Sequence, residues 1–358
     1  MIKFVSKKIL YGIIVLYGVI TVIFFLFNVL PGDPATIMLG QRANKDAIDA
    51  IHKDLGTDRP ILDQYVRYLN DLSPISIHNN SNSNSHWFLN IEKYTWIPLF
   101  TLGANKSVIL KYPYLRRSYI TKRRVSEIIK ETLPETAVLA FTSIIIASII
   151  GIFFGIISAI KRNSIYDRMA LVIAVLGMAA PSFFVGLIIA WLFGYVLKDY
   201  TGLTPTGSLY DIDVWEGEKL KLQNLILPAL TLGIRPLAIV VQLMRSSLLD
   251  VMNQDYIRTA KAKGLSMTNV IIKHALKNAL NPVVTAISGW FAGLMAGAVF
   301  VEHIFSWKGI GYEVFEALTK NDLPVVMGAT LIFATIFVFT NIFVDIIYGV
   351  LDPRVRVK

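Results

Sequence analysis

Long apolar runs that lack charged residues constrain this chain more than any other feature. The first runs from Ile9 to Leu30, directly after Lys7 and Lys8, and has 22 residues, whereas a helix that crosses a bilayer core needs about 20. It is longer than the apolar core of a secretory signal, and the sequence that follows, Pro31-Gly32-Asp33-Pro34, ends a helix rather than presenting a cleavage site. We therefore predict that residues 1–30 form an uncleaved N-terminal transmembrane helix.

Five further runs have the length and polarity of membrane-spanning helices, so the sequence predicts an all-α membrane protein with six transmembrane helices. The composition agrees, since 17% of the residues are charged, against about 25% in an average soluble domain. The fourth run contains Arg235-Pro236, which indicates either a protein-lined or wet position within a span, or a half-span or kink near one interface. The five runs are Glu135–Ile160, Met169–Leu197, Leu222–Met244, Pro282–Val301 and Val325–Leu351.

The distribution of basic residues predicts the orientation of these spans, because short cytoplasmic loops are enriched in Lys and Arg. With the N-terminus inside, the four cytoplasmic pieces hold 15 Lys and Arg, and the two short external loops hold 5. Both termini are therefore expected in the cytoplasm, and residues 31–124 form a long external segment. The cytoplasmic pieces are Met1–Lys8, Lys161–Arg168, Arg245–Asn281 and Asp352–Lys358, and the short external loops are Lys198–Lys221 and Glu302–Pro324.

The external segment is expected to be partly folded. Apolar spacing over Ala47–Tyr68, broken by Gly56 and Pro60, predicts two short helices. A polar tract at Asn79–Ser85 predicts a flexible tip. The aromatic stretch from Trp87 to Phe100 suits either the headgroup level of the membrane or the surface of a partner, and the sequence does not choose between them.

Charge and cysteine content exclude several function classes. The net charge of +10, combined with this hydropathy, indicates loops that face anionic lipid rather than nucleic acid. The chain has no cysteine, which excludes a disulfide scaffold, a thiolate metal site and a cysteine nucleophile. We predict neither a metal site nor a catalytic residue.

The loop Arg245–Asn281 carries the strongest functional signal. Its first half has apolar residues at helical spacing, and Gly264 suits the left-handed position that ends a helix. Ser266 then caps a second helix, Met267–Leu280, and Asn281-Pro282 bends the chain into the fifth span. This helix–turn–helix could dock into a groove of a cytoplasmic partner or lie on anionic lipid, and physical reasoning leaves both open. The apolar residues of the first half are Leu248, Leu249, Met252 and Tyr256.

In this loop the sequence resembles type I importer permeases of the ATP-binding cassette class. Their coupling motif reads E-A-A, three residues, then G; this chain has Arg258-Thr259-Ala260 and Gly264 at those positions, as in the dipeptide/oligopeptide/nickel branch. The stretch 73–113 departs from the resemblance and resembles an insertion. Further matching segments are Leu30–Pro34, Leu133–Thr136, Ala180–Phe183, Leu227–Gly233, Val301–Gly311 and Leu351–Arg356.

The resemblance implies a type I importer permease fold with a permease core at residues 125–351, a coupling loop at 245–281 and a cytoplasmic tail at 352–358. It implies a pore shared with a second homologous permease, two ATPase subunits below it, and an extracytoplasmic binding protein that delivers substrate. ATP and magnesium would bind the ATPase subunits, because this chain has no G-x-x-x-x-G-K-[ST] motif and no cofactor site of its own. The residues expected to couple to the ATPase are Asp255, Tyr256, Arg258, Thr259, Ala260, Lys263 and Gly264.

Two further features are expected to shape the pore. Gly289, Gly293 and Gly297 recur every four residues and predict a close helix approach at the pore or dimer interface, with a substrate site as the alternative. Pro181 is expected to kink the third span. Asn341 and Asp345 lie one helical turn apart in the sixth span, where a structural hydrogen bond is favoured over a proton relay.

The implied function is ATP-driven import of short peptides, or of nickel chelates or related solutes, across the inner membrane of a prokaryote. A secondary transporter or channel is the alternative, and it would require coupling charges at mid-membrane and no ATPase partner. A membrane-embedded hydrolase is disfavoured, because no histidine lies deep in a predicted span and neither H-E-x-x-H nor G-x-S-x-G occurs.

Overall fold

The computed structural model describes residues 2–29, 34–39, 45–79, 87–89, 93–102, 106–213 and 217–351. These residues form two compact units. We call Met1–Gly12, Thr132–Phe315 and Thr335–Lys358 the core unit, and Ile13–Glu131 with Glu316–Ala334 the second unit. The tail 352–358, most of the Leu30–Pro34 segment and most of the polar tract 79–85 lie outside the described residues.

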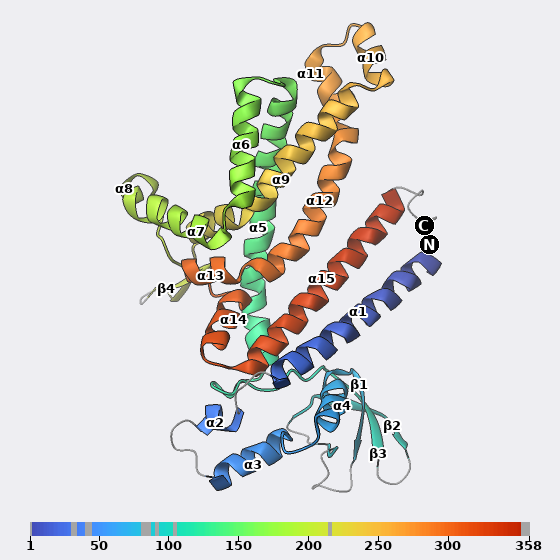
Figure 1. Ribbon diagram of the computed structural model, residues 1–358, viewed down its shortest axis with the longest axis vertical. Coiled ribbons are helices and arrows are strands. Elements are labelled where there is room, and N and C mark those ends of the chain that lie inside the picture. Colours follow the sequence, from blue (N-terminus) through green and yellow to red (C-terminus); the bar gives the residue numbers. More distant parts are fainter. Residues whose placement is uncertain are drawn as a thin grey trace. The chain divides into compact units, whose positions relative to one another are not determined.

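Helices dominate both units (Figure 1). Two π-helical segments, Leu192–Val196 and Val270–Ala275, and a 3-10 turn, Leu222–Leu225, adjoin the α-helices. The α-helices are α1 (Ile2–Val29), α2 (Pro34–Leu39), α3 (Lys45–Leu55), α4 (Ile61–Leu72), α5 (Val125–Ile160), α6 (Ile165–Ala179), α7 (Ser182–Trp191), α8 (Lys198–Thr201), α9 (Ile226–Met252), α10 (Asp255–Ala262), α11 (Met267–Asn269), α12 (Leu276–Gly297), α13 (Val299–Phe305), α14 (Ile310–Thr319) and α15 (Leu323–Leu351). The strands are β1 (Ile75–Asn79), β2 (Trp96–Leu102), β3 (Lys106–Lys111), β4 (Tyr210–Asp213) and β5 (Gly217–Leu220).

The described residues contain up to six candidate membrane spans, when each of two bent helix pairs is counted as one span. Four helices are long and apolar enough to cross a bilayer unaided: α1, α5, α9 with its preceding turn, and α15. The third span bends by 111° between α6 and α7, and the fifth bends by 61° between α12 and α13. Pro181 lies at the first bend with φ −61° and ψ 133°, so the predicted break in the third span is confirmed.

Of two proline positions inside predicted spans, one confirms the sequence prediction and the other differs from it. Helix α9 continues through Pro236, and the span extends over Leu222–Met252; the half-span alternative is therefore wrong. Helix α12 likewise continues through Pro282 instead of bending at Asn281-Pro282. Proline is tolerated inside these spans because the adjoining turns and the packed neighbouring helices maintain the helix when one hydrogen bond is lost.

The second span also begins earlier than predicted. Helix α5 starts at Val125 and contains 36 residues, which corresponds to about 54 Å at 1.5 Å per residue. That length exceeds a hydrocarbon core of about 30 Å. The segment Leu133–Thr136, expected to open the span, therefore lies inside the helix. Hydropathy alone does not mark the start of this helix, because its first turns contain charged side chains such as Glu127 and Lys130.

A three-stranded antiparallel sheet of order β1-β3-β2 belongs to the second unit. The sequence analysis did not predict these strands or the β4–β5 hairpin of the core unit, so they are additions to the expected all-α fold. The aromatic stretch forms the edge strand β2, where Pro98 is tolerated because an edge strand leaves one row of backbone groups unpaired. The two predicted short helices are confirmed as α3 and α4, separated by Gly56 at φ +73°.

A buried carboxylate organises the second unit around α4 and the sheet. Asp71 accepts hydrogen bonds from Tyr94 at 2.5 Å and from Lys93 at 3.1 Å, while Lys111 donates to its backbone oxygen at 2.5 Å. Burial opposes ionisation of Asp71, but the charge of Lys93 and the bonds from Tyr94 and Lys93 outweigh it and hold the pKa below its usual value. Burial also lowers the pKa of Lys111 to about 8 and the pKa of His78 to about 4.

A second buried carboxylate, Glu302 in α13, joins three segments of the core unit. It accepts hydrogen bonds from the Thr136 hydroxyl at 2.6 Å and from the backbone N–H of Tyr312 at 3.0 Å. The same Thr136 oxygen accepts from the N–H of Ile310 at 2.9 Å. The indole of Trp307 donates to the backbone oxygen of Glu135 at 3.0 Å. Helices α5, α13 and α14 are thereby fixed to one another through polar groups, of which the Glu302 and Thr136 side chains are fully buried.

The polar pair predicted in the sixth span has structural partners. Asp345 forms an ion pair with Lys8 of α1 at 2.6 Å, and Asn341 donates to the backbone oxygen of Phe337 at 2.8 Å. An aspartate neutralised by a lysine is stabilised as a charged pair within the core unit. These contacts favour the structural role over a proton relay.

We expect Gly309→Ala to destabilise the core unit, because the new methyl group would overlap the Glu302 carboxylate and the Thr136 hydroxyl. Overpacking of this kind costs about 1–3 kcal/mol. The measurement is thermal unfolding of the purified chain in detergent. Gly289→Ala is the matched control, because a methyl group there meets no described atom within 4 Å. Equal melting temperatures for the two variants would contradict the assigned packing.

We expect the second unit to lose stability as the pH falls from about 6.5 to about 4. The unfolded chain binds a proton at His78 near pH 6.5, whereas the folded chain does so only near pH 4, so acidification favours unfolding in that window. Urea unfolding of the full chain at a series of pH values, followed by tryptophan fluorescence, measures the effect. His78→Phe should flatten the pH dependence between these limits; an unchanged slope would refute the assignment.

Candidate coupling loop and intramembrane cavity

Helix α10 and the short α11 form a projection at the end of α9 and α12 that lies away from α13 (Figure 1). Helix α9 ends at Met252, the chain turns through Asn253-Gln254, and α10 starts at Asp255. The predicted single apolar helix face is therefore wrong, because Leu248 and Tyr256 belong to different helices. The two residues between the helices redirect α10 away from the axis of α9.

Gly264 closes α10 as the sequence predicts. Its φ is +79°, and its N–H donates to the backbone oxygen of Lys261 at 2.9 Å, while the N–H of Leu265 reaches the oxygen of Ala260 at 3.4 Å. This pair of bonds is the Schellman arrangement that satisfies the last carbonyls of a helix. Ser266 then caps the next helical segment by accepting from the N–H of Asn269 at 3.4 Å. The helix–glycine turn–helix prediction is confirmed.

The inner face of α10 is packed onto the ends of the neighbouring helices. Ile257 is fully buried and Ala260 nearly so, and both belong to a cluster with Met244 and Leu248 of α9 and Val270 of the segment before α12. Because these apolar side chains are already buried within the chain, they are not available to lipid. The packing holds α10 firmly on the two spans from which it projects.

The outer face of α10 carries most of the predicted coupling residues. Tyr256 is anchored by Asn278, whose side chain donates to the tyrosine oxygen at 2.8 Å. Arg258 pairs with Asp255 at 3.3 Å. Ala260, in contrast, faces the buried cluster and has a packing role. The exposed predicted residues are Asp255, Tyr256, Arg258, Thr259, Lys263 and Gly264.

An ion pair that the sequence analysis missed ties α6 to α9 close to this projection. The guanidinium of Arg245 donates to both carboxylate oxygens of Asp167, at 2.6 and 2.8 Å. Asp167 is buried and also accepts from the Ser158 hydroxyl and from the N–H of Asn163. The partners lie 78 positions apart in the sequence, so no local pattern marks them as neighbours.

A cavity of about 210 Å³ lies beside the bend of the third span. Ala180 and Ser182 flank Pro181 at its wall, so the predicted kink borders the cavity. Arg235, the arginine inside the fourth span, also lines it. The full lining is Gly177, Ala180, Ser182, Val185, Thr231, Leu232, Ile234, Arg235, Trp290, Gly293 and Leu294.

The glycine stripe of α12 makes no close helix contact where the chain is described. A methyl group at Gly289 or Gly293 would meet no described atom within 4 Å, and Gly293 borders the cavity. The surroundings of Gly297 lie outside the described residues. Only a second chain could approach α12 closely at these glycines, so the predicted close helix contact remains a prediction.

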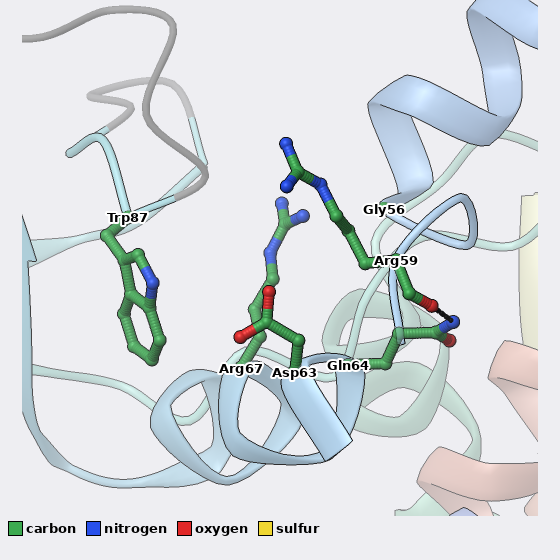
Figure 2. A pocket seen from close by; sticks show the side chains of 6 residues that line it. All are labelled: Gly56, Arg59, Asp63, Gln64, Arg67 and Trp87. Atoms are coloured by element: carbon green, nitrogen blue, oxygen red, sulfur yellow. Dashed lines mark hydrogen bonds between the residues drawn. The ribbon is translucent and has the colours of Figure 1, made fainter. Parts of the chain in front are cut away.

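A smaller hollow in the second unit is unsuited to a substrate. It has a volume of about 10 Å³, which is about the space that one water requires. Figure 2 shows its side chains, with the Gln64 amide donating to the backbone oxygen of Arg59 at 2.8 Å. The lining is Gly56, Arg59, Asp63, Gln64, Arg67 and Trp87. In the described parts of the chain, no group of three or more His, Asp or Glu side chains could hold a metal ion.

Two family models match this chain. Residues 151–357 match the binding-protein-dependent transport system inner membrane component, and residues 1–85 match its N-terminal part. The first match contains α10, the cavity and the Asp167–Arg245 pair. The chain belongs to this family. Members are the membrane component of a transport system, so the expectation that the chain is a permease rather than an enzyme is confirmed.

Curated permeases are similar over their whole length. The dipeptide transport system permease protein DppB of Alkalihalophilus pseudofirmus is 34% identical, and the match covers 99% of this chain and 100% of that protein. The di/tripeptide transport system permease protein DppB of Pseudomonas aeruginosa is 32% identical over 99% of both chains. The glutathione transport system permease protein GsiC of Escherichia coli K12 is 33% identical over 100% of both chains.

We expect Arg245→Ala in this permease to lower the free energy of unfolding by about 3 kcal/mol, because it leaves the buried carboxylate of Asp167 without its cation. Thermal unfolding in detergent measures the loss. Combining Arg245→Ala with Asp167→Asn should recover part of it, since the buried charge is then absent. Arg168→Ala, at the exposed arginine that follows Asp167 in α6, is the control. It should change stability by no more than about 0.5 kcal/mol. Asp167→Asn is also measured alone. If the losses in free energy of unfolding of the two single variants add up to the loss of the double variant, the two side chains do not interact and the pairing is contradicted.

Proposed function

We propose that this chain is one of two permease subunits of an ATP-driven importer that carries short peptides across the cytoplasmic membrane of a prokaryote. Its partners are a second, homologous permease, two ATPase subunits on the cytoplasmic side and an extracytoplasmic substrate-binding protein. ATP and magnesium bind the ATPase subunits. Both termini and the loop 245–281 face the cytoplasm, and residues 31–124 face outward.

One observation carries the proposal: the outer face of α10 is polar and exposed while its inner face is buried on α9 and α12. A helix seated in this way can transmit a push to two spans at once. An amphipathic pair lying on lipid would instead turn its apolar side outward. The peptide cargo is supported by the end-to-end similarity to permeases named for dipeptides, di/tripeptides and glutathione.

The coupling step follows from the way in which α10 is mounted. Closure of the ATPase subunits around ATP moves the helix that rests in their cleft. Ile257 and Ala260 transfer this motion to α9 and to the start of α12 through the buried cluster. The Arg245–Asp167 pair extends it to α6. The spans then alternate between inward and outward access, and the chain itself needs no catalytic group.

Reconstitution of the whole complex tests the proposal. The chain is co-expressed with its second permease and ATPase subunits, inserted into liposomes with ATP inside, and supplied with peptide-loaded binding protein outside. We expect uptake of labelled dipeptides that stops when ATP is omitted. Uptake of nickel chelates alone would correct the cargo, and ion-driven uptake by this chain without ATPase subunits would refute the importer.

We expect Gly264→Val to lower ATP-dependent uptake by at least about tenfold while the chain still inserts and assembles. A β-branched residue resists φ +79°, at a cost of about 1–2 kcal/mol, so the turn that positions α10 would be distorted. Gly217→Val is the matched control, since Gly217 has φ +73° and equally open surroundings, but lies in the β4–β5 hairpin. If Gly264→Val transports normally, α10 does not couple.

A further inference from the structure

Arg235 places a charge in the middle of a membrane span. It is nine residues from the start of α9 and 17 from its end, which corresponds to about 14 Å from the start of the helix. A charged side chain at such a depth is costly unless it meets an opposite charge, backbone carbonyls or water. Its guanidinium lies beside the cavity at the bend of the third span.

The contacts of Arg235 leave its charge largely uncompensated. Its Nη2 approaches the backbone oxygen of Ala180 at 3.5 Å, the upper limit of a hydrogen bond, and no ion pair forms between Arg235 and any described carboxylate. The buried carboxylate of Asp167 is not available to Arg235, because it already accepts hydrogen bonds from Arg245 and Ser158. A free guanidinium fork is suited to bind a carboxylate through two parallel hydrogen bonds.

The remaining walls of the cavity are suited to the end of a peptide rather than to an ion alone. Trp290, Leu294 and Val185 supply apolar surface, while Ser182 adds a hydroxyl. Among the described lining residues, Arg235 is the only charged one. The volume of about 210 Å³ exceeds the roughly 150 Å³ that holds a benzene-sized molecule. One amino-acid residue with its terminal carboxylate therefore fits.

We propose that Arg235 binds the C-terminal carboxylate of the peptide as it passes the bend of the third span, and that this cavity is the intramembrane site for the cargo. The inference rests on the proposed function and identifies where in this chain the cargo is bound. Gly177 and Gly293 keep the cavity open, because neither presents a side chain to it. A single guanidinium binds a carboxylate weakly, which allows the peptide to leave again toward the cytoplasm.

The test compares Arg235→Gln, Arg235→Lys and wild type in the reconstituted complex. We expect Arg235→Gln to lower the maximal rate of dipeptide uptake at least about tenfold, with unchanged assembly of the complex and an unchanged KM for the loaded binding protein. Arg235→Lys retains the charge and should keep an intermediate rate. Arg162→Gln, at an exposed arginine of the loop between α5 and α6, is the matched control and should transport like wild type.

A second readout separates substrate binding from a structural role. The purified complex without binding protein is incubated with a labelled dipeptide or with the same dipeptide as its C-terminal amide. Wild type should retain the free acid better than the amide, and Arg235→Gln should lose this difference. Equal retention of acid and amide, or retention of neither by wild type, would overturn the site. Loss of the assembled complex in Arg235→Gln would instead show that Arg235 pairs with the second permease, which also overturns it.

The two proposals fail in different ways. If wild type transports no peptide under any condition, the proposed function fails, and the inference fails with it. If wild type transports dipeptides and Arg235→Gln does so at the same rate, only the inference fails.

Discussion

The buried carboxylate of Glu302 is the interaction on which the core unit depends. It has no exposed surface, and a buried acceptor left without a partner costs about 1–3 kcal/mol or more. Thr136 and the N–H of Tyr312 satisfy it, so the middle of α5 and the start of α14 must meet at α13. Apolar packing between spans is poorly directional, because lipid is as apolar as the helices. Hydrogen bonds to a shared carboxylate have a fixed geometry, so they specify which faces of the helices meet.

The core unit is tightly packed near α10 and contains a cavity beside the bend of the third span. Toward α10, the buried Arg245–Asp167 pair and the cluster around Ile257 join α6, α9, α10 and α12 into one body. Beside the bend of the third span, α6, α7, α9 and α12 surround a cavity with an unneutralised arginine. Alternating access requires a rigid region that moves as one body and a cavity whose shape can change. The packed helices at α10 and the cavity beside the bend have these two properties.

Local patterns predicted the features that depend on residues close together in sequence. The turn at Gly264, the cap at Ser266 and the break at Pro181 follow from the conformations that those residue types favour. The predictions failed where other helices decide the outcome. Pro282, where a bend was predicted, remains inside a helix because packing outweighs local propensity. Strand β2 was missed because its aromatic residues suit a membrane interface equally well.

Hydropathy thus determined from the sequence that the chain spans the membrane, and the pattern of the loop 245–281 predicted the helix–turn–helix that projects from α9 and α12. Only the tertiary structure decided which residues act together. Glu302 and Thr136 lie 166 positions apart in the sequence, and Arg245 and Asp167 lie 78 positions apart. A local sequence pattern cannot predict contacts between residues so far apart. The cavity likewise could not be predicted from the sequence, because the bend at Pro181 brings residues of α6, α7, α9 and α12 together around it, and these residues lie far apart in the sequence.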